Sequence, residues 1–481
     1  MVSRTVAREC PVALRTDAGG AARAIQAVCD CKSSQLFLTN DFIAVANPTL
    51  TGRTDVTVVE ATHAAASNID RVFGNAGPEV RGGLHAAMQK AFAGLSDYPA
   101  SIAEGRKALT AFEQARPADW ARIAEVRIRL ALALARSSKL EDAGTQLEAA
   151  EAAIETAHLQ EPSVEAQYWW ARASVESYRL ALPQALEDYQ RAWTLAQRPS
   201  LLPLHVRNQI EFSYSDALRM AGKFAAAQRQ ASDLLARERT RLGVSSPLTC
   251  YTAALLASIL GYRNQETDGI VMAKQASACL SKSLGPTNIR TIATYQVLAD
   301  LQFQSRLYDD AAQAYDKVAA MSAGVVGPRA LRTISARENA GVSRQYAGQT
   351  KQADDSLTAA LAVAHAALGW THPTTENLRF HLADCRLDRR RTRGVGRLLA
   401  GLSVPVLNEG EIESDWKGRL AYEQGRLELY TGHAERAVPL LRTALQVIGT
   451  KDPDGPIRVA AISDLIHTAL MTETSARTIR R

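Results

Sequence analysis

The amino-acid sequence predicts an all-α protein, an α-solenoid built from about eight to nine stacked helical hairpins. Three observations predict it. Small residues return every 42 residues, turn and proline signals return in the same frame, and no segment has the two-residue alternation that is typical of a β-strand. The chain has 481 residues, of which 46% are hydrophobic and 22% charged, as in an ordinary folded protein.

The small residues form columns along the sequence. Two antiparallel helices approach to about 8–10 Å only where small side chains face each other, so each column is predicted to mark a helix contact. The first column reads Ala143, Ala185, Ala227, Gly269, Ala311, Ala353 and Ala437. The second, twelve residues earlier, reads Ala131, Ala173, Ser215, Ala257, Ala299, Gly341, Ala383 and Gly425. A bulky column, predicted to fill the space between the helices, reads Leu147, Tyr189, Tyr315, Leu357, Leu399 and Leu441.

Turn signals divide these segments into helices. Within hairpins they include Gly222-Lys223-Phe224, and between hairpins a glycine C-cap precedes a proline, as in Leu284-Gly285-Pro286. Two frames depart from the pattern. One has Glu266 at its turn, and the frame around Val395 has arginines and no small anchor. We expect irregular hairpins at both places.

These columns resemble the tetratricopeptide repeat (TPR), whose signature has small residues at its eighth, twentieth and twenty-seventh positions and a bulky residue at its twenty-fourth. The 42-residue spacing with Leu-Gly-Pro connectors is similar to the kinesin-light-chain type of that repeat. The resemblance covers about residues 76 to 450. It implies a right-handed superhelix whose concave face is lined by the first helix of each hairpin, the A helix, while the second is the B helix.

The flanking segments carry a second resemblance. Phe37–Pro48, followed by a helix that ends at Phe73, is similar to the lead-in of the C-terminal TPR regions of bacterial serine/threonine kinases and winged-helix regulators, but the kinase and DNA-binding motifs are missing here. A closing helix at about Pro456 to Met471 is predicted to cover the open end of the array. The predicted domains are a flexible segment at 1–35, lead-in helices at 36–75, the repeat array at 76–450, and a capping helix with a basic tail at 451–481.

Charge and cysteine content bear on the compartment. A net charge of +6 is too small to indicate nucleic-acid binding by itself, and no stretch is long and apolar enough for a membrane span. The six cysteines are scattered, which predicts free thiols in a reducing compartment. We expect a cytoplasmic protein. The alternative is an extracytoplasmic one, if an upstream portion with a membrane span is missing.

Catalytic motifs are missing from the sequence. It has no P-loop, no His-Glu-x-x-His and no nucleophile elbow, and its nine histidines are scattered. Carboxylate pairs such as Asp309-Asp310 fall at the start of a B helix, where they complement the helix dipole. The sequence therefore predicts no enzyme activity, no cofactor and no metal site.

One charged cluster has two interpretations. Six arginines lie between Arg386 and Arg397, and they could bind phosphate or nucleic acid. The cluster falls at a turn without interleaved aromatic residues, which favours a solvated, disordered turn and no direct contact with nucleic acid. The candidate anion patch consists of Arg389, Arg390, Arg391 and Arg393.

The resemblance points to the concave face as the binding surface. The fifth and thirteenth positions of the resembled repeat, carried over frame by frame, and two amides near them give candidate residues for holding an extended peptide. Aromatic rings stack on the side chains of a peptide, and amides hold its backbone. The alternative is that some of these rings simply pack between neighbouring A helices. The candidates are Trp170, Tyr178, Phe212, Tyr262, Asn339, Tyr346, Asn377, Phe380, Tyr422 and Tyr430.

The predicted function is a non-catalytic scaffold or adaptor that binds a protein or peptide partner in this groove. The alternative is a detached or truncated sensor module of a bacterial kinase or winged-helix regulator system.

Overall fold

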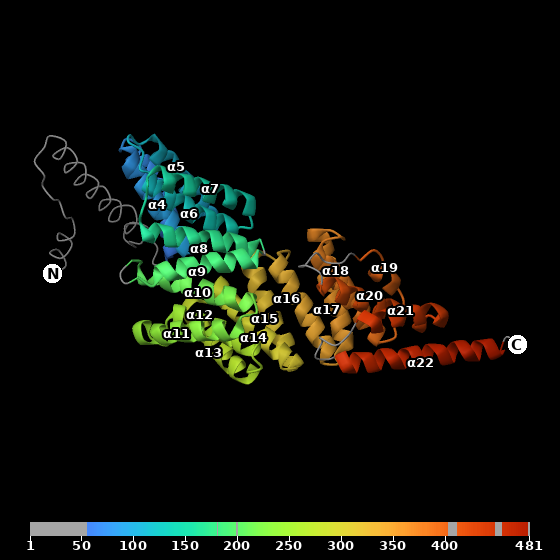
Figure 1. The fold of residues 1–481 in the computed structure, drawn as a ribbon. Coiled ribbons are helices and arrows are strands. Elements are labelled where there is room, and N and C mark those ends of the chain that lie inside the picture. The colour runs from blue at the N-terminus through green and yellow to red at the C-terminus, as the bar shows by residue number, and fades with distance from the viewer. Residues whose placement is uncertain (1–54, 180, 199–200, 403–410, 448–454, 480–481) are drawn as a thin grey trace, which may run out of the picture. The chain divides into compact units, whose positions relative to one another are not determined.

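The computed structural model describes residues 55–179, 181–198, 201–402, 411–447 and 455–479 as helices and their connections, with no strand in these ranges (Figure 1). The described chain divides into two compact units, residues 1–230 and 231–481. The boundary falls inside α11 (Phe224–Leu242). Each unit is described by itself below.

Unit 1 consists of the lead-in helix α3 (Val58–Phe73) and helical hairpins. Successive helices pack as pairs, α4 with α5, α6 with α7 and α8 with α9, and the A helices α4, α6, α8 and α10 also contact one another in turn. The bounds are α4 (Pro78–Gly94), α5 (Tyr98–Gln114), α6 (Trp120–Arg136), α7 (Leu140–Thr156), α8 (Pro162–Tyr178), α9 (Leu182–Ala196) and α10 (Leu204–Met220).

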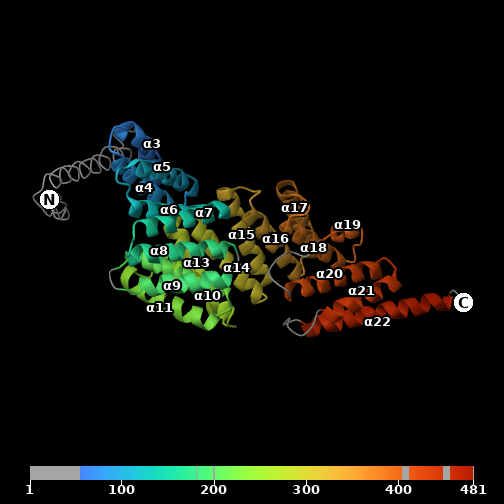
Figure 2. The ribbon, with the colours of Figure 1, turned by 45° about the horizontal axis from the view of Figure 1, so that its top comes forward.

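Unit 2 continues the hairpin pattern to the closing helix α22 (Gly455–Ile479). The helices α20, α21 and α22 lie side by side (Figure 2), and α22 packs mainly on α21. The other bounds are α12 (Pro247–Gly261), α13 (Glu266–Leu284), α14 (Ile289–Gln304), α15 (Tyr308–Val326), α16 (Leu331–Tyr346), α17 (Thr350–Leu368), α18 (Pro373–Asp388), α19 (Val395–Leu399), α20 (Glu411–Tyr430) and α21 (Ala434–Val447).

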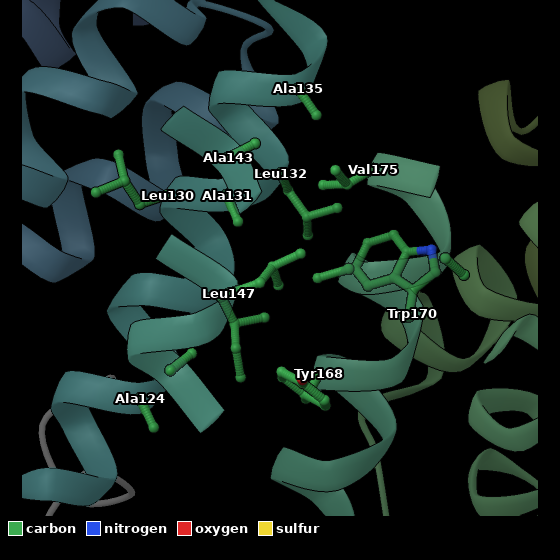
Figure 3. Packing of buried hydrophobic residues seen from close by; sticks show 14 of the residues in the cluster. Ala124, Leu130, Ala131, Leu132, Ala135, Ala143, Leu147, Tyr168, Trp170 and Val175 are labelled. Atoms are coloured by element: carbon green, nitrogen blue, oxygen red, sulfur yellow. The ribbon is translucent and has the colours of Figure 1, made fainter. Parts of the chain in front are cut away.

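The small columns lie at the helix contacts, as the sequence predicts. Ala143, Ala185 and Ala353 are all 0% exposed, and Ala131 and Leu147 face each other in the core around α6 and α7 (Figure 3). A methyl group added at Gly341 would lie 2.7 Å from the Leu357 side chain. The small position on each A helix therefore makes room for the bulky position on its B helix, and the predicted fold class is confirmed.

In the first hairpin the large residue lies on the A helix and the small residue on the B helix. Gln89 occupies the small column on α4 and is 0% exposed, while Gly105 on α5 occupies the bulky column. A methyl group added at Gly105 would lie 2.5 Å from the Gln89 amide nitrogen, which donates to the Val126 carbonyl at 3.1 Å. The large and the small residue have exchanged helices, so the contact between α4 and α5 is preserved.

The turn inside each hairpin repeats the same backbone conformation. Eight of the described hairpin turns contain a residue of positive φ, and the numbers of these residues differ by multiples of 42. Glycine fills three of these places (Gly222, Gly348 and Gly432), whereas other residues fill the rest: Ser96, Ser138, Asn264, Arg306 and Arg390. The hairpins thus share a turn as well as a core.

The structure corrects one expectation about irregular hairpins and confirms the other. Glu266 is the first residue of a regular helix, α13, where its negative charge complements the helix dipole, so the expectation there is wrong. The frame at Val395 is irregular, because α19 has only 5 residues. The lead-in helix ends at Phe73 as expected, and the closing helix is longer than expected. Residues 1–54, with the flexible segment and Phe37–Pro48, lie outside the described residues.

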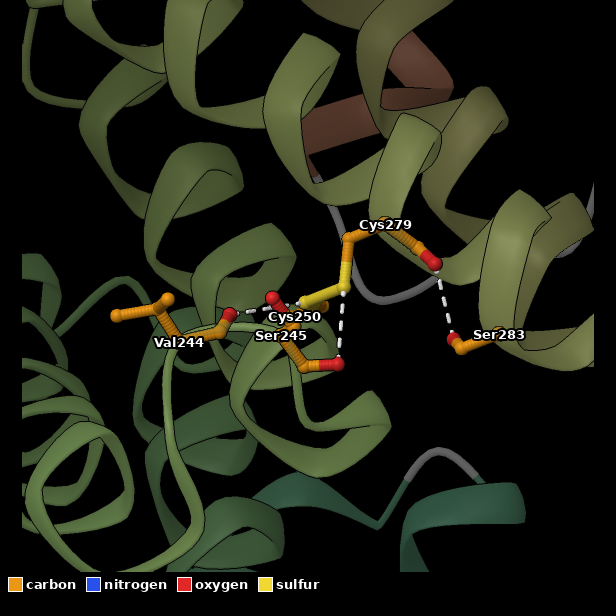
Figure 4. The surroundings of a disulfide bond; sticks show 5 residues. All are labelled: Val244, Ser245, Cys250, Cys279 and Ser283. Atoms are coloured by element: carbon orange, nitrogen blue, oxygen red, sulfur yellow. Dashed lines mark hydrogen bonds between the residues drawn. A yellow bond between two sulfur atoms is a disulfide. The ribbon is translucent and has the colours of Figure 1, made fainter.

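A disulfide joins Cys250 on α12 to Cys279 on α13 (Figure 4), which corrects the expectation of free thiols for these two residues. Their Cα atoms are 6.3 Å apart, within the usual range for such a bond. The equivalent residues one repeat later, Ile292 and Met321, belong to one apolar cluster, in which Ile292 is buried and Met321 is partly buried. Cys385 is a buried free thiol. None of the described helices is long and apolar enough to cross a membrane.

Candidate functional site

The aromatic candidates at the fifth position of the frame lie mostly inside helix contacts. Trp170 on α8 is 7% exposed and donates from its indole nitrogen to the Ser213 hydroxyl on α10 at 3.1 Å. Phe380 on α18 is 2% exposed, with its ring centre 4.8 Å from that of Trp416 on α20. Phe212 and Tyr422 are half-buried. Trp170 and Phe380 thus serve A-helix packing.

The tyrosines at the thirteenth position lie at the carboxyl ends of A helices and are accessible. Tyr178, Tyr262 and Tyr346 are 52%, 48% and 50% exposed. Tyr430 is half-buried, with the Arg390 guanidinium 5.6 Å from its ring centre. Each of these rings is suited to an amphipathic contact within its own unit, because it combines an apolar face with a phenol hydroxyl.

The two predicted amides lie on neighbouring A helices of unit 2. Asn339 on α16 and Asn377 on α18 are half-buried, and neither side-chain amide forms a hydrogen bond within the part of the chain that the structure describes. Between these helices the His381 ring contacts the Glu338 carboxylate at 2.9 Å. An amide carries donors and an acceptor, so both side chains keep their capacity to bind a peptide backbone.

A buried charge network joins α18 to α20 in unit 2, and sequence reasoning missed it. Arg426 on α20 donates to Asp384 at 2.8 Å and Asp388 at 2.6 Å on α18, and to Glu423 at 2.9 Å. Gln345 on α16 donates to Asp388 at 2.7 Å. Asp384 and Arg426 are 42 residues apart, and both occupy the ninth position of the frame. Including that position among the candidate positions of the repeat would have identified both residues.

Burial governs the protonation of this network. Desolvation, together with the nearby Asp384 charge, raises the pKa of Glu423 well above its ordinary value, although Arg426 opposes the shift. Desolvation also raises the pKa of Tyr422 to about 12. Burial alone would lower the pKa of Arg426, but the surrounding carboxylates outweigh it and raise the pKa. The guanidinium is therefore a fixed positive charge at the centre of the network.

One aspartate forms ion pairs with three members of the arginine cluster. For these three residues the expectation of a solvated, disordered turn is wrong. Asp354 on α17 is 4% exposed and pairs with Arg386 at 3.0 Å, Arg389 at 3.6 Å and Arg391 at 2.6 Å. Sequence reasoning missed this because Asp354 precedes the cluster by more than thirty residues. Arg393 is exposed and forms no ion pair within the described residues.

Other features of the described chain lie apart from the candidate residues. A hollow of about 590 Å³ between α8 and α9 is lined by Glu165, Trp169 and Arg191 among others, and it contains none of the predicted site residues. Among the residues the structure covers, no cluster of histidine, cysteine and acidic side chains could hold a metal ion.

Comparisons with known proteins concern the fold. No family model matches the chain, and no curated protein matches it. The structure is similar to a Rap protein complexed with competence and sporulation factor, with 12% identity, coverage of 79% of this chain and 99% of that chain, and a TM-score of 0.52. It is also similar to the apo form of the quorum sensor NprR from B. thuringiensis, with 10% identity, coverage of 76% and 97%, and a TM-score of 0.51.

The fold is a TPR-like α-solenoid. A further match is a kinesin light chain protein of Podosopora anserina with nearly identical TPR-like repeats, at 16% identity, coverage of 41% of this chain and 93% of that chain, and a TM-score of 0.39. These identities are too low to transfer a function. In this TPR-like fold, polar contacts join α16 to α18 through Glu338 and His381, and α18 to α20 through Asp384 and Arg426.

Proposed function

We propose that the chain is a non-catalytic scaffold that binds an extended segment of a protein partner on the A helices of unit 2. The observation that carries the proposal is the pair of half-buried amides, Asn339 and Asn377, whose side chains make no hydrogen bond within the described chain. Half-buried amides keep contact with water, so each hydrogen bond to a bound peptide would contribute a net of about 0.5–1.5 kcal/mol. A bound peptide backbone would satisfy both.

The surroundings of the amides support an extended ligand. Tyr346 and Tyr430 lie at the ends of α16 and α20, and Tyr422 lies on the same helix as Tyr430. Rings at these places would contact alternate side chains of a peptide while the amides hold its backbone. Tyr262 is proposed as an additional contact in unit 2, and Tyr178 and Phe212 as contacts of unit 1 by itself. Phe380 is buried beneath the surface of unit 2, whereas Trp170 packs between α8 and α10 within unit 1.

A sensor module is the second candidate function. The neighbouring structures include a Rap protein complexed with competence and sporulation factor and a quorum sensor, which supports a regulatory use of this fold. In a sensor module the bound ligand is a signal, and its binding changes the association of this chain with a separate effector protein. A reading frame upstream that encodes a kinase or winged-helix domain would favour it.

The domain organisation and the compartment are part of the proposal. We infer a lead-in at 36–75, a repeat array at 76–450 and a cap at 451–481. The Cys250–Cys279 bridge supports the extracytoplasmic alternative over the cytoplasm, because disulfides persist in oxidising compartments and are rare in the cytosol. We propose no cofactor, metal or nucleic acid as a ligand.

Two double variants test the amides. Asn339→Ala with Asn377→Ala should weaken binding of the native partner, identified by co-purification with the full chain, by about tenfold or more, measured by calorimetry. Gln275→Ala with Gln313→Ala, at exposed positions on α13 and α15, is the matched control and should bind like the wild type. Undiminished binding by the asparagine variant, with an unchanged melting temperature, would exclude this site.

A further inference from the structure

The carboxyl ends of the A helices in unit 2 form a continuous edge. Its thirteenth-position residues are Tyr262, Gln304, Tyr346, Asp388 and Tyr430, and each step from one A helix to the next is marked by a contact. A methyl group at Gly261 would lie 2.9 Å from the Gln304 side-chain oxygen. The ring of Phe303 lies 5.5 Å from that of Tyr346.

The same contacts continue to the last A helix. Gln345 donates to Asp388 at 2.7 Å, and Arg426 donates to Asp388 at 2.6 Å. Arg390 then reaches over the Tyr430 ring at 5.6 Å. Side chains separated by about one repeat, 38 to 43 residues, are therefore neighbours along one row, which we name the turn edge.

Tyrosine and arginine alternate along the turn edge. Tyr346 and Tyr430 are the last residues of α16 and α20 and Tyr262 directly follows α12, while the turns after α14 and α18 carry Arg306 and Arg390 at the position of positive φ. Asparagine or glycine fills that position in the other turns of unit 2 (Asn264, Gly348, Gly432), and an arginine there costs about 1–2 kcal/mol. Both arginines are exposed, so the strained turns present guanidinium groups to solvent.

Positive charge exceeds negative charge at the α18 end of the turn edge. Asp354 is shared by Arg386, Arg389 and Arg391, so a single carboxylate faces three guanidinium groups. Arg390 stacks on a ring rather than on a carboxylate, and Arg393 forms no ion pair within the described residues. Arg426 is shared by three carboxylates, those of Asp384, Asp388 and Glu423, so the groups named at this end comprise six guanidinium groups and four carboxylates. The surplus is exposed and lies beside Tyr430.

We propose that the turn edge docks an acidic segment of a protein partner, with carboxylates on Arg390 and Arg393 and apolar side chains on Tyr346 and Tyr430. Neighbouring A helices are about 8–10 Å apart and an extended chain rises about 3.3 Å per residue, so one step matches about three residues. Because tyrosines and arginines each recur at every second A helix, the segment would alternate apolar and acidic residues about three apart, with a full repeat of about six residues. This inference rests on the proposed scaffold function and names the chemistry of its partner.

A designed peptide series tests the charge preference on the full-length chain. The probes are fluorescently labelled (Glu-Glu-Leu)4, (Gln-Gln-Leu)4 and (Lys-Lys-Leu)4 peptides and a thymidine dodecanucleotide, and binding is followed by anisotropy. The acidic peptide should bind about tenfold or more tightly than its glutamine counterpart, which corresponds to about 1.4 kcal/mol. An acidic peptide that binds no better than the glutamine peptide would overturn the inference, and so would a nucleotide that binds more tightly than the acidic peptide.

Variants locate the site. Arg390→Asn with Arg393→Gln removes two charges, and asparagine tolerates the positive φ at residue 390. This variant should lose about tenfold in affinity for the acidic peptide, whereas Arg442→Gln, an exposed arginine on the B helix α21, should lose none. Equal binding by the wild type and the Arg390 variant contradicts the inference. The proposed scaffold function is tested separately, by the binding of the Asn339→Ala with Asn377→Ala variant to the native partner. Failure of this inference is therefore distinguishable from failure of the proposed function.

Discussion

At the scale of single residues, the packing depends on volumes that match across a hairpin. Ala131 faces Leu147 in one frame, whereas Gln89 and Gly105 exchange the two sizes in another. A search for small residues in fixed columns predicts the first kind of contact and misses the second, because the column itself is broken at Gln89. Packing requires that the two side chains that face each other across a hairpin together fill a constant volume. A single sequence reveals this requirement only where the small residue always lies on the same helix of the hairpin.

Gly105→Leu should lower the free energy of unfolding by about 1–3 kcal/mol, because the new side chain overlaps Gln89 in a closed core. Adding Gln89→Ala should restore part of the loss, since the pair then matches Ala131 and Leu147. The measurement is a double-mutant cycle by urea denaturation, with an expected coupling energy of about 0.5–3 kcal/mol. Strictly additive effects would show that the two residues do not share this contact.

The repeated turn predicts a second effect. Ser138 has a φ of 60° and is exposed, so Ser138→Gly should relieve backbone strain and raise the free energy of unfolding by about 0.5 kcal/mol. The reciprocal change Gly348→Ala, at a φ of 77°, should lower it by about 1 kcal/mol. Thermal melts of both variants check the pair, and a loss of stability in Ser138→Gly would contradict the shared-turn account.

At the scale of helices, the sequence predicts most boundaries and fails where contacts are distant. Proline and glycine predict the starts of α8, α12 and α18, and the missing small anchor predicts the irregular frame at α19. The ion pairs between Asp354 and the arginine cluster join residues on different hairpins, so no local pattern indicates them. Burial likewise separates Trp170 and Phe380 from the exposed tyrosines, although all were candidates of the same kind.

The disulfide is the covalent element of one hairpin. It links α12 to α13 across 29 residues, so its loss should lower the stability of unit 2 by about 3 kcal/mol in the chain-entropy account. Cys250→Ala with Cys279→Ala should melt like the reduced wild type and below the oxidised wild type. Mass spectrometry of peptides digested without reductant should detect the linked pair, and two free thiols in freshly purified protein would contradict the bridge.

At the scale of the whole molecule, each hairpin contacts chiefly its neighbours in sequence. Stability should therefore be a sum of hairpin and nearest-neighbour contributions rather than the property of one core. Ala353→Leu should accelerate amide hydrogen exchange in α16, α17 and α18, while exchange in α4 and α5 stays at the wild-type rate. A uniform acceleration along the chain would indicate a single cooperative unit instead.

The 42-residue spacing of small residues at helix contacts is the central claim, and the free energy of unfolding of Ala185→Leu tests it most directly. Ala185 is 0% exposed, whereas its neighbour Gln184 is exposed. Urea denaturation should give a loss of about 1–3 kcal/mol for Ala185→Leu and a change within about 0.5 kcal/mol for the control Gln184→Leu. An Ala185→Leu protein as stable as the wild type would contradict the account.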